Sequence, residues 1–308
     1  MSRTLSAQSR RTLPTTLTPG PWVQELVGSE SQSYETNGTV HTITNGEFAS
    51  LVTVRIDRVR NLDASQFEQA TIEAYRNIRS DLKQLRHSHP VRFWNFLPAI
   101  HEPMDANRDR YMVFNSGRFV AFSDWFGGIG HLPERLPAAS GVGHDGGELV
   151  IHCLAFERPG DAIENPRQIP AFRYSARYGP RPPCFARATV AQDPRDNGLL
   201  LLVAGTASIR GEQTIHPTDL QGQLDETITN LRALLAVAEG SVPSNDLKSF
   251  SDVRVYFLRD QDVVAIEKMT RETFGLATRV QMCRADICRA DLLVEIEGVA
   301  QLQRRSHR

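Results

Sequence analysis

The second half of the chain alternates between two hydrophobic patterns, and this alternation restricts the fold more than any other feature of the sequence. Residues 199–203 form a continuous apolar run, which is typical of a strand buried on both faces. Beyond Pro217, leucines and isoleucines recur every three or four residues up to Leu235, which predicts a helix with one apolar face, ending at Gly240. This half must therefore pack a helix against a buried sheet.

The same patterns continue towards the C-terminus. Strands are predicted over residues 253–258, 280–283 and 292–300, and a helix over 262–274. The order strand, helix, strand, helix, strand, strand favours a mixed sheet with its helices packed on one face, which is an α+β fold.

The first half is expected to form a second α+β unit of similar style. The patterns predict a strand over residues 48–56, a helix over 63–85, and extended segments at 92–96 and 112–114. Loops are expected at residues 86–90, 136–147 and 159–183, where Pro or Gly interrupt the patterns. The expected division of the chain is a disordered tail over residues 1–20, an N-terminal domain over 21–147, and a C-terminal domain over 148–308 that carries most of the site. The proline-rich segment at residues 159–183 is the alternative place for the domain boundary.

Composition and charge exclude several classes of function. The chain has 308 residues and a formal net charge of -1, so no global basic field indicates a nucleic-acid partner. No apolar run is long enough to span a membrane, and residues 1–20 lack the apolar centre of a secretory signal. The four cysteines show neither zinc-site nor disulfide spacing. We therefore expect a cytoplasmic protein that acts on a small molecule.

Two carboxylates lie on one face of the last predicted strand. Alternation along residues 292–300 puts Glu295 and Glu297 on the same side. If that face is buried, desolvation and the neighbouring like charge favour the neutral form of one carboxyl, which can then donate a proton at neutral pH. If the strand lies at an edge of the sheet, both carboxylates face solvent and have no such role. Alternation alone leaves both interpretations open.

Three further segments carry candidate binding groups. Residues 173–187 combine arginines with Tyr174 and Tyr178, and guanidinium groups bind carboxylates in a bidentate way, although a basic surface loop would have the same composition. The small residues 205–208 follow a buried strand and would allow backbone amides to approach a ligand, or would simply form a turn. Cys288 is either a buried apolar filler or a site residue.

The second half resembles the reactive-intermediate deaminase, or YjgF-like, family. The resemblance rests on residues 224–240 and 252–260, on the helix that ends at Phe274-Gly275, and on Leu-Leu-Val-Glu-Ile-Glu at 292–297. It implies a mixed sheet packed on two helices, with an arginine and the first glutamate of the Glu-Ile-Glu run in a site at the subunit junctions of a trimer. Glu295 matches that glutamate, and Arg279 is the nearest match to the arginine.

Most of residues 90–300 resembles the chorismatases, which carry such YjgF-like domains in one longer chain. Five segments in the right order carry the resemblance: 91–98 (Val-Arg-Phe-Trp-Asn-Phe-Leu-Pro), 111–118 (Tyr-x-x-Phe-x-x-Gly-Arg), 178–187, 205–217 and 287–298. It implies two YjgF-like units in one chain. It also implies an enzyme that detaches the enolpyruvyl group of chorismate as pyruvate, with no metal or organic cofactor.

The resemblance also implies residue roles. Neutral Glu295 would protonate the vinyl methylene of chorismate, and Glu297 would stabilise the resulting cation if it faces the site. The residues implied in substrate binding are Arg187, Tyr174, Tyr178, Ala207, Gly205, Arg118 and Arg279.

The two markers of product identity disagree. Cys288 resembles the types that form 3-hydroxybenzoate, or both 3- and 4-hydroxybenzoate. Ala207 resembles the hydrolytic type, which forms 3,4-dihydroxycyclohexa-1,5-diene carboxylate. We favour hydroxybenzoate, because a thiol has chemistry of its own whereas a methyl group differs only in size.

Two other classes of function stay open: an imine or enamine deaminase, and a ligand-binding module without catalysis. The chain is expected to be a monomer or a small homo-oligomer, with neither a nucleic-acid nor a membrane partner.

Overall fold

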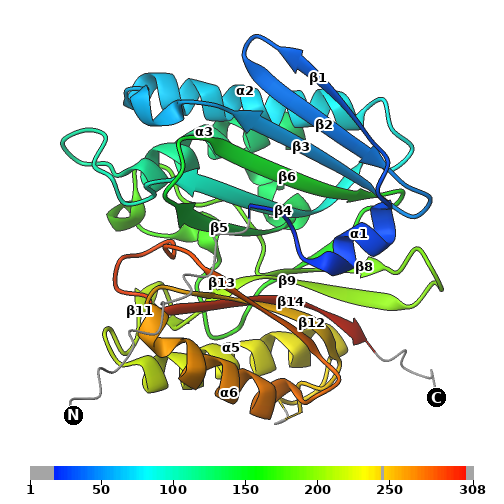
Figure 1. Cartoon of the computed structure of the whole chain (residues 1–308), viewed down its shortest axis with the longest axis vertical. Helices are drawn as coiled ribbons and strands as arrows, with labels where there is room; N and C mark the ends of the chain where they lie inside the picture. Colours follow the sequence, from blue (N-terminus) through cyan, green and yellow to red (C-terminus); the bar gives the residue numbers. More distant parts are fainter. Residues whose placement is uncertain (1–16, 244–245, 303–308) are drawn as a thin grey trace, which may run out of the picture.

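Two six-stranded mixed sheets form the centre of the computed structural model, which describes residues 17–243 and 246–302 (Figure 1). In spatial order, the first sheet contains β1 (Ser31–Thr36), β2 (Thr39–Asn45), β3 (Ser50–Ile56), β6 (Leu149–Phe156), β4 (His89–Pro98) and β5 (Ala138–His144). The second contains β13 (Arg279–Arg284), β12 (Phe250–Phe257), β14 (Val294–Leu302), β9 (Leu199–Ala207), β8 (Ala188–Gln192) and β7 (Asp161–Ile163). A short hairpin is formed by β10 (Ile209–Arg210) and β11 (Gln213–Thr214).

Helices connect these strands. The α-helices are α1 (Pro21–Val27), α2 (Ala64–Leu82), α3 (Arg110–Phe126), α4 (Leu132–Arg135), α5 (Leu220–Glu239) and α6 (Val263–Phe274). The short 3-10 helices are η1 (Val59–Asn61), η2 (Ile129–His131), η3 (Ala171–Arg173), η4 (Ala176–Tyr178) and η5 (Asp260–Asp262). Within the described ranges, no helix is both long and apolar enough to cross a membrane.

The two halves of the chain repeat one topology. In each half, three antiparallel strands come first, and a helix then leads to a fourth strand. A second helix leads to a fifth strand parallel to the fourth, as in the pairs β4–β5 and β12–β13. The last strand inserts between the third and the fourth, so β6 and β14 occupy equivalent positions. The predicted α+β chain of two similar units is therefore confirmed.

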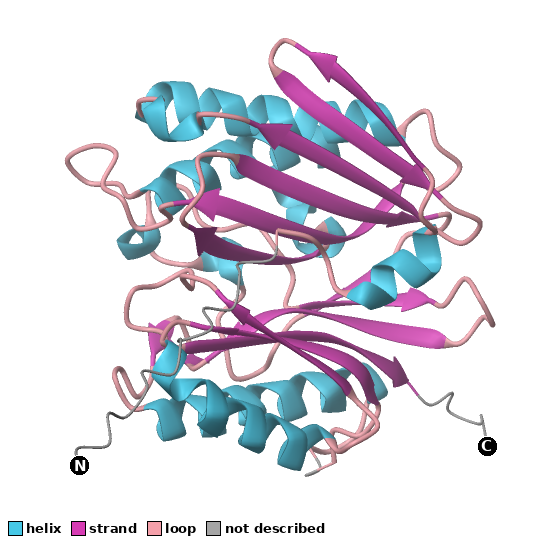
Figure 2. Cartoon of the chain, in the orientation of Figure 1, coloured by secondary structure: helices cyan, strands magenta, loops and turns pink. Residues whose placement is uncertain are grey.

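Alternating side chains divide each sheet between two cores, as a strand period of two requires. Phe93 on β4 packs with α2 and α3, whereas its neighbour Trp94 packs between the sheets. Val203 on β9 faces the core with α5 and α6, whereas Leu202 faces the first sheet. The layers are thus helices, sheet, sheet and helices, with the strands inside (Figure 2). The central strand β9 is buried on both faces along most of its length, which explains the continuous apolar run at residues 199–203.

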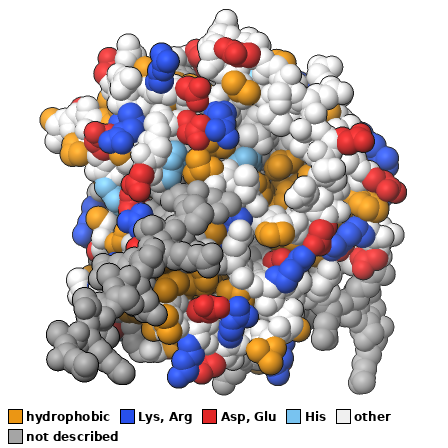
Figure 3. Space-filling view, in the orientation of Figure 1, with side chains coloured by type: hydrophobic (Ala, Val, Ile, Leu, Met, Phe, Trp, Pro, Cys, Tyr) orange, Lys and Arg blue, Asp and Glu red, His pale blue; other side chains and the backbone are white. Residues whose placement is uncertain are grey.

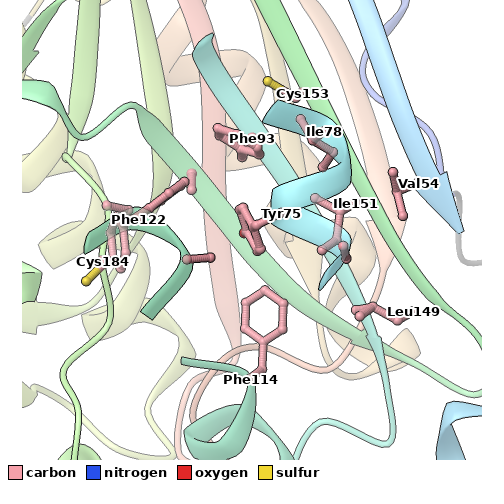
Figure 4. Packing of buried hydrophobic residues seen from close by; sticks show 14 of the residues in the cluster. Val54, Tyr75, Ile78, Phe93, Phe114, Phe122, Leu149, Ile151, Cys153 and Cys184 are labelled. Atoms are coloured by element: carbon pink, nitrogen blue, oxygen red, sulfur yellow. The ribbon is translucent and has the colours of Figure 1, made fainter. Parts of the chain in front are cut away.

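An aromatic cluster fixes α2 and α3 on the first sheet. The ring of Tyr75 lies 5.0 Å from that of Phe122 and 5.4 Å from that of Phe93, and Phe114 packs on the same side (Figure 4). The hydroxyl of Tyr75 donates to Asn95 Oδ1 at 2.7 Å, so its burial leaves no unpaired polar group. This packing determines where α3 presents its polar side chains.

Two predictions in the first half are wrong. Residues 112–114 lie in α3 rather than in an extended segment, because Asp109 caps the helix by accepting from the Met112 amide. Residues 136–147 contain β5 rather than only a loop. In β5 the small residues are needed for close packing: a Cβ at Gly143 would lie 2.5 Å from the Ile100 side chain, and one at Gly141 would lie 3.2 Å from the Tyr111 ring.

The expected division between residues 147 and 148 is one strand too early. Leu149–Phe156 pairs with β3 and β4 of the first sheet, so the chain passes to the second sheet only after Phe156. The glycines of residues 136–147 suggested a loop between domains, but they belong to β5 and to the turn that follows it. Residues 159–183 are largely irregular, as predicted, apart from β7, η3 and η4.

Of the tail expected over residues 1–20, residues 1–16 lie outside the described part of the chain. Leu17 and Thr18 contact both sheets: the Leu17 carbonyl accepts from His152 Nε2 at 2.8 Å, and the Thr18 carbonyl accepts from Arg254. The end of the expected tail is therefore bound to the folded chain.

Candidate active site

A cavity of about 470 Å³ lies where the two units meet. The first unit contributes residues of α3 and β5 to its lining, and the second contributes residues of β9, β14 and the loop between β13 and β14. Isolated bridges between Ala138 and Ala186, and between Gly143 and Asp286, join the units beside it. Residues distant in sequence are therefore brought together only by the packing of one unit on the other.

Glu295 lies inside this cavity near the start of β14. The strand runs between β12 and β9, where Tyr256 and Ala207 are the partners of Glu295, and the residue is only 3% exposed. The interpretation of β14 as a solvent-exposed edge strand is therefore wrong. Glu295 Oε1 has no hydrogen-bond partner among the described residues, whereas Oε2 lies 3.9 Å from Cys288 Sγ. Glu295 thus lines the cavity, and its Oε1 lies against Gly205 of β9 without a hydrogen-bond partner among the described residues.

Gly205 on β9 makes room for this carboxyl. A Cβ at this position would overlap the Glu295 side chain. The glycine predicted as a binding residue therefore acts through Glu295, by letting its carboxyl lie against the backbone of the neighbouring strand.

The carboxyl of Glu295 holds its proton more firmly than an ordinary glutamate does. Burial is the largest cause that raises the pKa of Glu295 to about 8, and the charge of Glu297 acts in the same direction. The guanidinium groups of Arg92 and Arg187 and the contact with Cys288 oppose this shift but do not cancel it. At neutral pH the neutral acid dominates, so Glu295 can act as a proton donor.

Two buried arginines provide positive charge in the cavity. Arg187 donates to the Tyr174 hydroxyl at 2.7 Å and to the Ile169 carbonyl at 3.1 Å, and Arg118 donates to Asn115 Oδ1 at 2.8 Å. In both, the Nε–H group is buried and has no partner among the described residues. Buried guanidinium groups are normally saturated with acceptors, so these two are suited to an anion in the cavity.

A third arginine, Arg289, closes one wall. Its guanidinium lies 4.0 Å from the ring centroid of Tyr178 and donates to the Glu212 carbonyl at 2.8 Å. The Tyr178 hydroxyl donates to the same carbonyl at 2.5 Å, and its ring centroid lies 5.1 Å from that of Tyr174. Tyr178 thus forms part of the cavity wall, and its hydroxyl proton is already donated to a protein carbonyl.

The Cys288 side chain is partly exposed to the cavity and packs on an apolar cluster that includes Ala207. Burial raises the pKa of Cys288 to about 12, and the charge of Glu295 contributes in the same direction. The residue is therefore a neutral thiol at physiological pH, able to donate a weak hydrogen bond but not to act as a thiolate.

Two expected site residues are absent from this cavity. Arg279 begins β13, an edge strand, where it pairs with Glu25 and with Asp252 at 2.7 Å. Glu297 points to a second cavity of about 400 Å³, which Arg279 also lines. The position of Arg279 does not fit the prediction that it binds substrate in this cavity. The position of Glu297 does not fit a direct contact with the cation, which was expected only if Glu297 faced the site. Glu295 and Cys288 line the cavity, and so do six of the seven residues predicted to bind substrate: Arg187, Tyr174, Tyr178, Ala207, Gly205 and Arg118.

Sequence reasoning missed several lining residues. Tyr111 and Met112 line the cavity from α3, and Arg289 lies beside Cys288. Tyr111 and Arg118 are seven residues apart, which is two helical turns, so a predicted helix would have placed them on one face. The adjacency of Arg289 to Cys288 was the available signal for the arginine.

The surface shown in Figure 3 has no concentration of one sign of charge among its described residues. The face in Figure 3 shows positive and negative side chains interspersed among the described residues, in keeping with the net charge of -1. Among the residues that the structure describes, no group of three or more His, Cys, Asp or Glu side chains could hold a metal ion. The arginines of the cavity are thus a local concentration of positive charge, suited to a small anion.

Comparison with known proteins identifies the family of this chain. A family model described as "Chorismatase FkbO/Hyg5-like, N-terminal" matches residues 25–155. A 3-hydroxybenzoate synthase of Streptomyces hygroscopicus is 35% identical over 242 residues, covering 76% of this chain and 70% of the relative. A chorismatase of Streptomyces rapamycinicus is 31% identical over 243 residues, covering 77% of this chain and 71% of the relative.

The crystal structure of a chorismatase agrees with this assignment. A crystal structure of a chorismatase superposes with a TM-score of 0.74 at 28% identity, covering 87% of this chain and 79% of that one. A Rid-family protein of Yersinia pestis matches 46% of this chain and 99% of its own length, at 16% identity and a TM-score of 0.35. From the extent and identity of the sequence matches, and from the chorismatase structure, we conclude that this chain belongs to the chorismatase family.

Proposed function

We propose that this protein converts chorismate to pyruvate and 3-hydroxybenzoate, with Glu295 as the proton donor. The observation that carries the proposal is the position of a buried carboxyl, with its pKa raised to about 8, in the same cavity as buried arginines. Chorismate carries two carboxylates beside an acid-sensitive enol ether. An acid next to anion-binding groups is the combination that such a substrate requires.

Arg187 and Arg118, which both line the cavity, bind the substrate carboxylates through their guanidinium groups. The two arginines enter the cavity from different units, and one dianion can therefore engage both. The hydroxyl of Tyr174 is held by Arg187 and offers its own proton to the same anion. These contacts orient the enol ether towards the carboxyl of Glu295, which lines the same cavity.

Glu295 then starts the reaction. Its proton forms a new C–H bond at the vinyl methylene, the electron pair comes from the enol-ether double bond, and positive charge develops on the ether carbon. In the hydrolytic reaction, water adds to this carbon, the bond from the carbon to the ring ether oxygen breaks, and pyruvate leaves with the oxygen of the water. For 3-hydroxybenzoate, the ring 4-hydroxyl adds to the carbon instead, the ring C4–O bond breaks as the C3–H proton is lost, and pyruvate leaves with that oxygen while the ring becomes aromatic. Of the two protons released in either route, one goes to the ring oxygen left behind and the other restores the Glu295 acid. Pyruvate and 3-hydroxybenzoate together contain the atoms of chorismate, so this product needs no net water, whereas the dihydroxydiene acid needs one.

Two observations favour 3-hydroxybenzoate. Cys288 is a neutral thiol 3.9 Å from Glu295 Oε2, so it touches the proton donor itself. The relative at 35% identity is a 3-hydroxybenzoate synthase. Ala207 supports the second candidate, the hydrolytic reaction that forms the dihydroxydiene acid, because its methyl group occupies the wall beside Cys288.

The decisive experiment incubates the purified protein with chorismate. Pyruvate is measured with a coupled dehydrogenase, and the ring products are separated by chromatography. Pyruvate with 3-hydroxybenzoate is the expected result. Pyruvate with the dihydroxydiene acid would assign the hydrolytic reaction. No pyruvate above the spontaneous rate would refute chorismate cleavage, and ammonia release from 2-aminoacrylate would then identify a deaminase.

The Cys288→Ala variant tests the product assignment. We expect the ratio of 3-hydroxybenzoate to dihydroxydiene acid to fall, because the thiol beside Glu295 is lost while the acid remains. Ala207→Gly is the matched variant at the residue that favours the hydrolytic reaction. An unchanged product ratio in Cys288→Ala would show that the thiol does not determine the product.

A further inference from the structure

Glu297 lies in a cage of hydrogen-bond donors that closes around its carboxylate. Oε1 accepts from Trp94 Nε1 at 2.8 Å and from the Tyr256 hydroxyl at 3.2 Å. Oε2 accepts from Arg92 at 2.8 Å and from the Ser140 hydroxyl. The residue is 4% exposed. The carboxylate thus has four donors, one of them a guanidinium, and these groups satisfy both of its oxygens.

The cage connects both sheets at one point. Trp94 and Arg92 lie on β4 and Ser140 lies on β5 of the first sheet, whereas Tyr256 and Glu297 lie on β12 and β14 of the second. Ser140 also lines the cavity that contains Glu295. The buried anion is therefore immobilised directly behind the proposed active site.

Glu297 and Glu295 are two residues apart on β14 and so share one face of the strand. Both side chains are buried, and interactions between charges are stronger in buried surroundings than in water. If Glu295 ionised, two like charges would be buried side by side. A fixed charge at Glu297 thus opposes the ionisation of Glu295.

We propose that Glu297 is a positioning residue whose caged negative charge keeps the proton on Glu295 between turnovers. The inference rests on the proposed role of Glu295 as the proton donor. Glu297 itself does not line the cavity with Glu295, and so it acts through Glu295 rather than on the substrate.

Other groups around Glu295 act in both directions. Arg92 on β4 and Arg187 before β8 favour the ionised form, and so does the thiol contact of Cys288. Tyr111 on α3 is coupled electrostatically to Glu295 as well. Among the charged neighbours, Glu297 has the largest influence on Glu295, and it is the one that favours the neutral acid.

The test measures the protonation of Glu295 without relying on turnover. The protonated carboxyl band is followed by infrared difference spectroscopy across pH, and its loss in Glu295→Gln assigns it. In Glu297→Gln we expect the midpoint of this band to fall by about one pH unit or more. The alkaline limb of kcat/KM for chorismate should move in the same direction.

Tyr256→Phe is the matched control, because it removes one donor from the cage and leaves the charge of Glu297 in place. Its titration midpoint should stay close to that of the wild type. Glu297→Gln leaves the buried guanidinium of Arg92 without its carboxylate partner, and this could prevent folding. In that case the double variant Arg92→Met/Glu297→Gln replaces it, because it removes the guanidinium as well. Its midpoint should still fall, by a smaller amount, because the influence of Glu297 exceeds that of Arg92.

An unchanged midpoint in the folded Glu297 variant, or an equal shift in Tyr256→Phe, would overturn the inference. Wild-type protein that forms pyruvate from chorismate while the midpoint does not respond to Glu297 would refute this role alone. Wild-type protein that forms no pyruvate would refute the proposed function, whatever the titration shows.

Discussion

At the scale of the residue, the environment of Glu295 explains how a glutamate can be an acid at neutral pH. Two causes act together: burial, which disfavours the charged form, and the like charge of Glu297 on the same strand face. The side chain also needs space, which Gly205 provides on the adjacent strand. These requirements lead to two predictions about single substitutions.

Glu295→Gln removes the proton donor while keeping the size of the side chain. We expect kcat for pyruvate release to fall by about 100-fold or more, because general-acid catalysis contributes at least that much. Binding of a non-reacting cyclic dicarboxylate, measured by calorimetry, should change little because the arginines remain. A variant that keeps wild-type activity would exclude Glu295 as the acid.

Gly205→Ala places a methyl group where the Glu295 carboxyl lies. We expect the carboxyl to be displaced and kcat to fall by about 100-fold, since small misplacements of catalytic groups have effects of this size. Gly147→Ala is the control, because a Cβ there meets nothing within 4 Å. Equal activity of the two variants in the pyruvate assay would contradict the steric role of Gly205.

At the scale of the element, α3 connects the core of the first unit to the site. One side of the helix packs in the aromatic cluster with Phe114 and Phe122, and the helix brings Tyr111 and Arg118 to the cavity. Its contact with α2 is close at Gly117, where a Cβ would lie 2.7 Å from the Glu68 carbonyl oxygen. The helix cannot approach α2 in this way with a larger residue.

Gly117→Ala should therefore separate α3 from α2. Overpacking of this kind destabilises a fold by about 1–3 kcal/mol, which outweighs the better helix propensity of alanine. Chemical denaturation measures the change, and Gly130→Ala is the control because a Cβ there meets nothing within 4 Å. Stabilisation of the Gly117 variant would show that the two helices can separate without loss.

Elements were predictable where their patterns were local. The helix over residues 63–85 is α2, which begins after the capping residue Asp63, and the second-half helices and strands lie close to their predicted positions. In α3, buried residues such as Asn115, Ser116 and Arg118 interrupt the apolar stripe, so periodicity did not reveal the helix. Its caps, Asp109 and Gly127, were the remaining signals.

At the scale of the whole molecule, the site depends on the docking of the two units. Arg118 comes from the first unit and Glu295 from the second, and the Glu297 cage with Arg92 and Ser140 holds the two sheets together beside them. Folding therefore buries the carboxyl of Glu295 only when both units are in place. That burial couples the protonation of one residue to the stability of the whole fold.

Stability should fall as pH rises from about 4.5 to about 8, with Glu295 contributing to the change. The pKa of Glu295 is raised from 4.5 to about 8 in the folded state, so between these values the folded protein keeps a proton that the unfolded chain releases. Glu295→Gln lacks this penalty. Its free energy of unfolding should exceed that of the wild type by a few kcal/mol, as an order of magnitude, at pH 8.

Denaturation of both proteins across pH measures this difference, which should vanish below about pH 4.5, where both folded and unfolded wild-type chains are protonated. A difference that stays constant from pH 4 to pH 9 would show that Glu295 has the same pKa in the folded and unfolded states.

The sequence by itself determined the local elements and the neighbours along a strand. Hydrophobic period distinguishes helix from strand, and alternation placed Glu295 and Glu297 on one face, because these properties depend on residues only a few positions apart. The chorismatase resemblance of the quoted segments also came from the sequence, together with six of the seven binding residues expected in the cavity.

Only the tertiary structure decided which faces are buried and which distant residues meet. It placed β14 at the centre of a sheet, put Arg279 on an edge strand with Glu25 and Asp252, and put Glu297 in the wall of the second cavity rather than that of Glu295. Such contacts follow from the packing of one unit on the other, which no local pattern encodes. The proton affinity of Glu295 is likewise not encoded by a local pattern, because it depends on burial by both units.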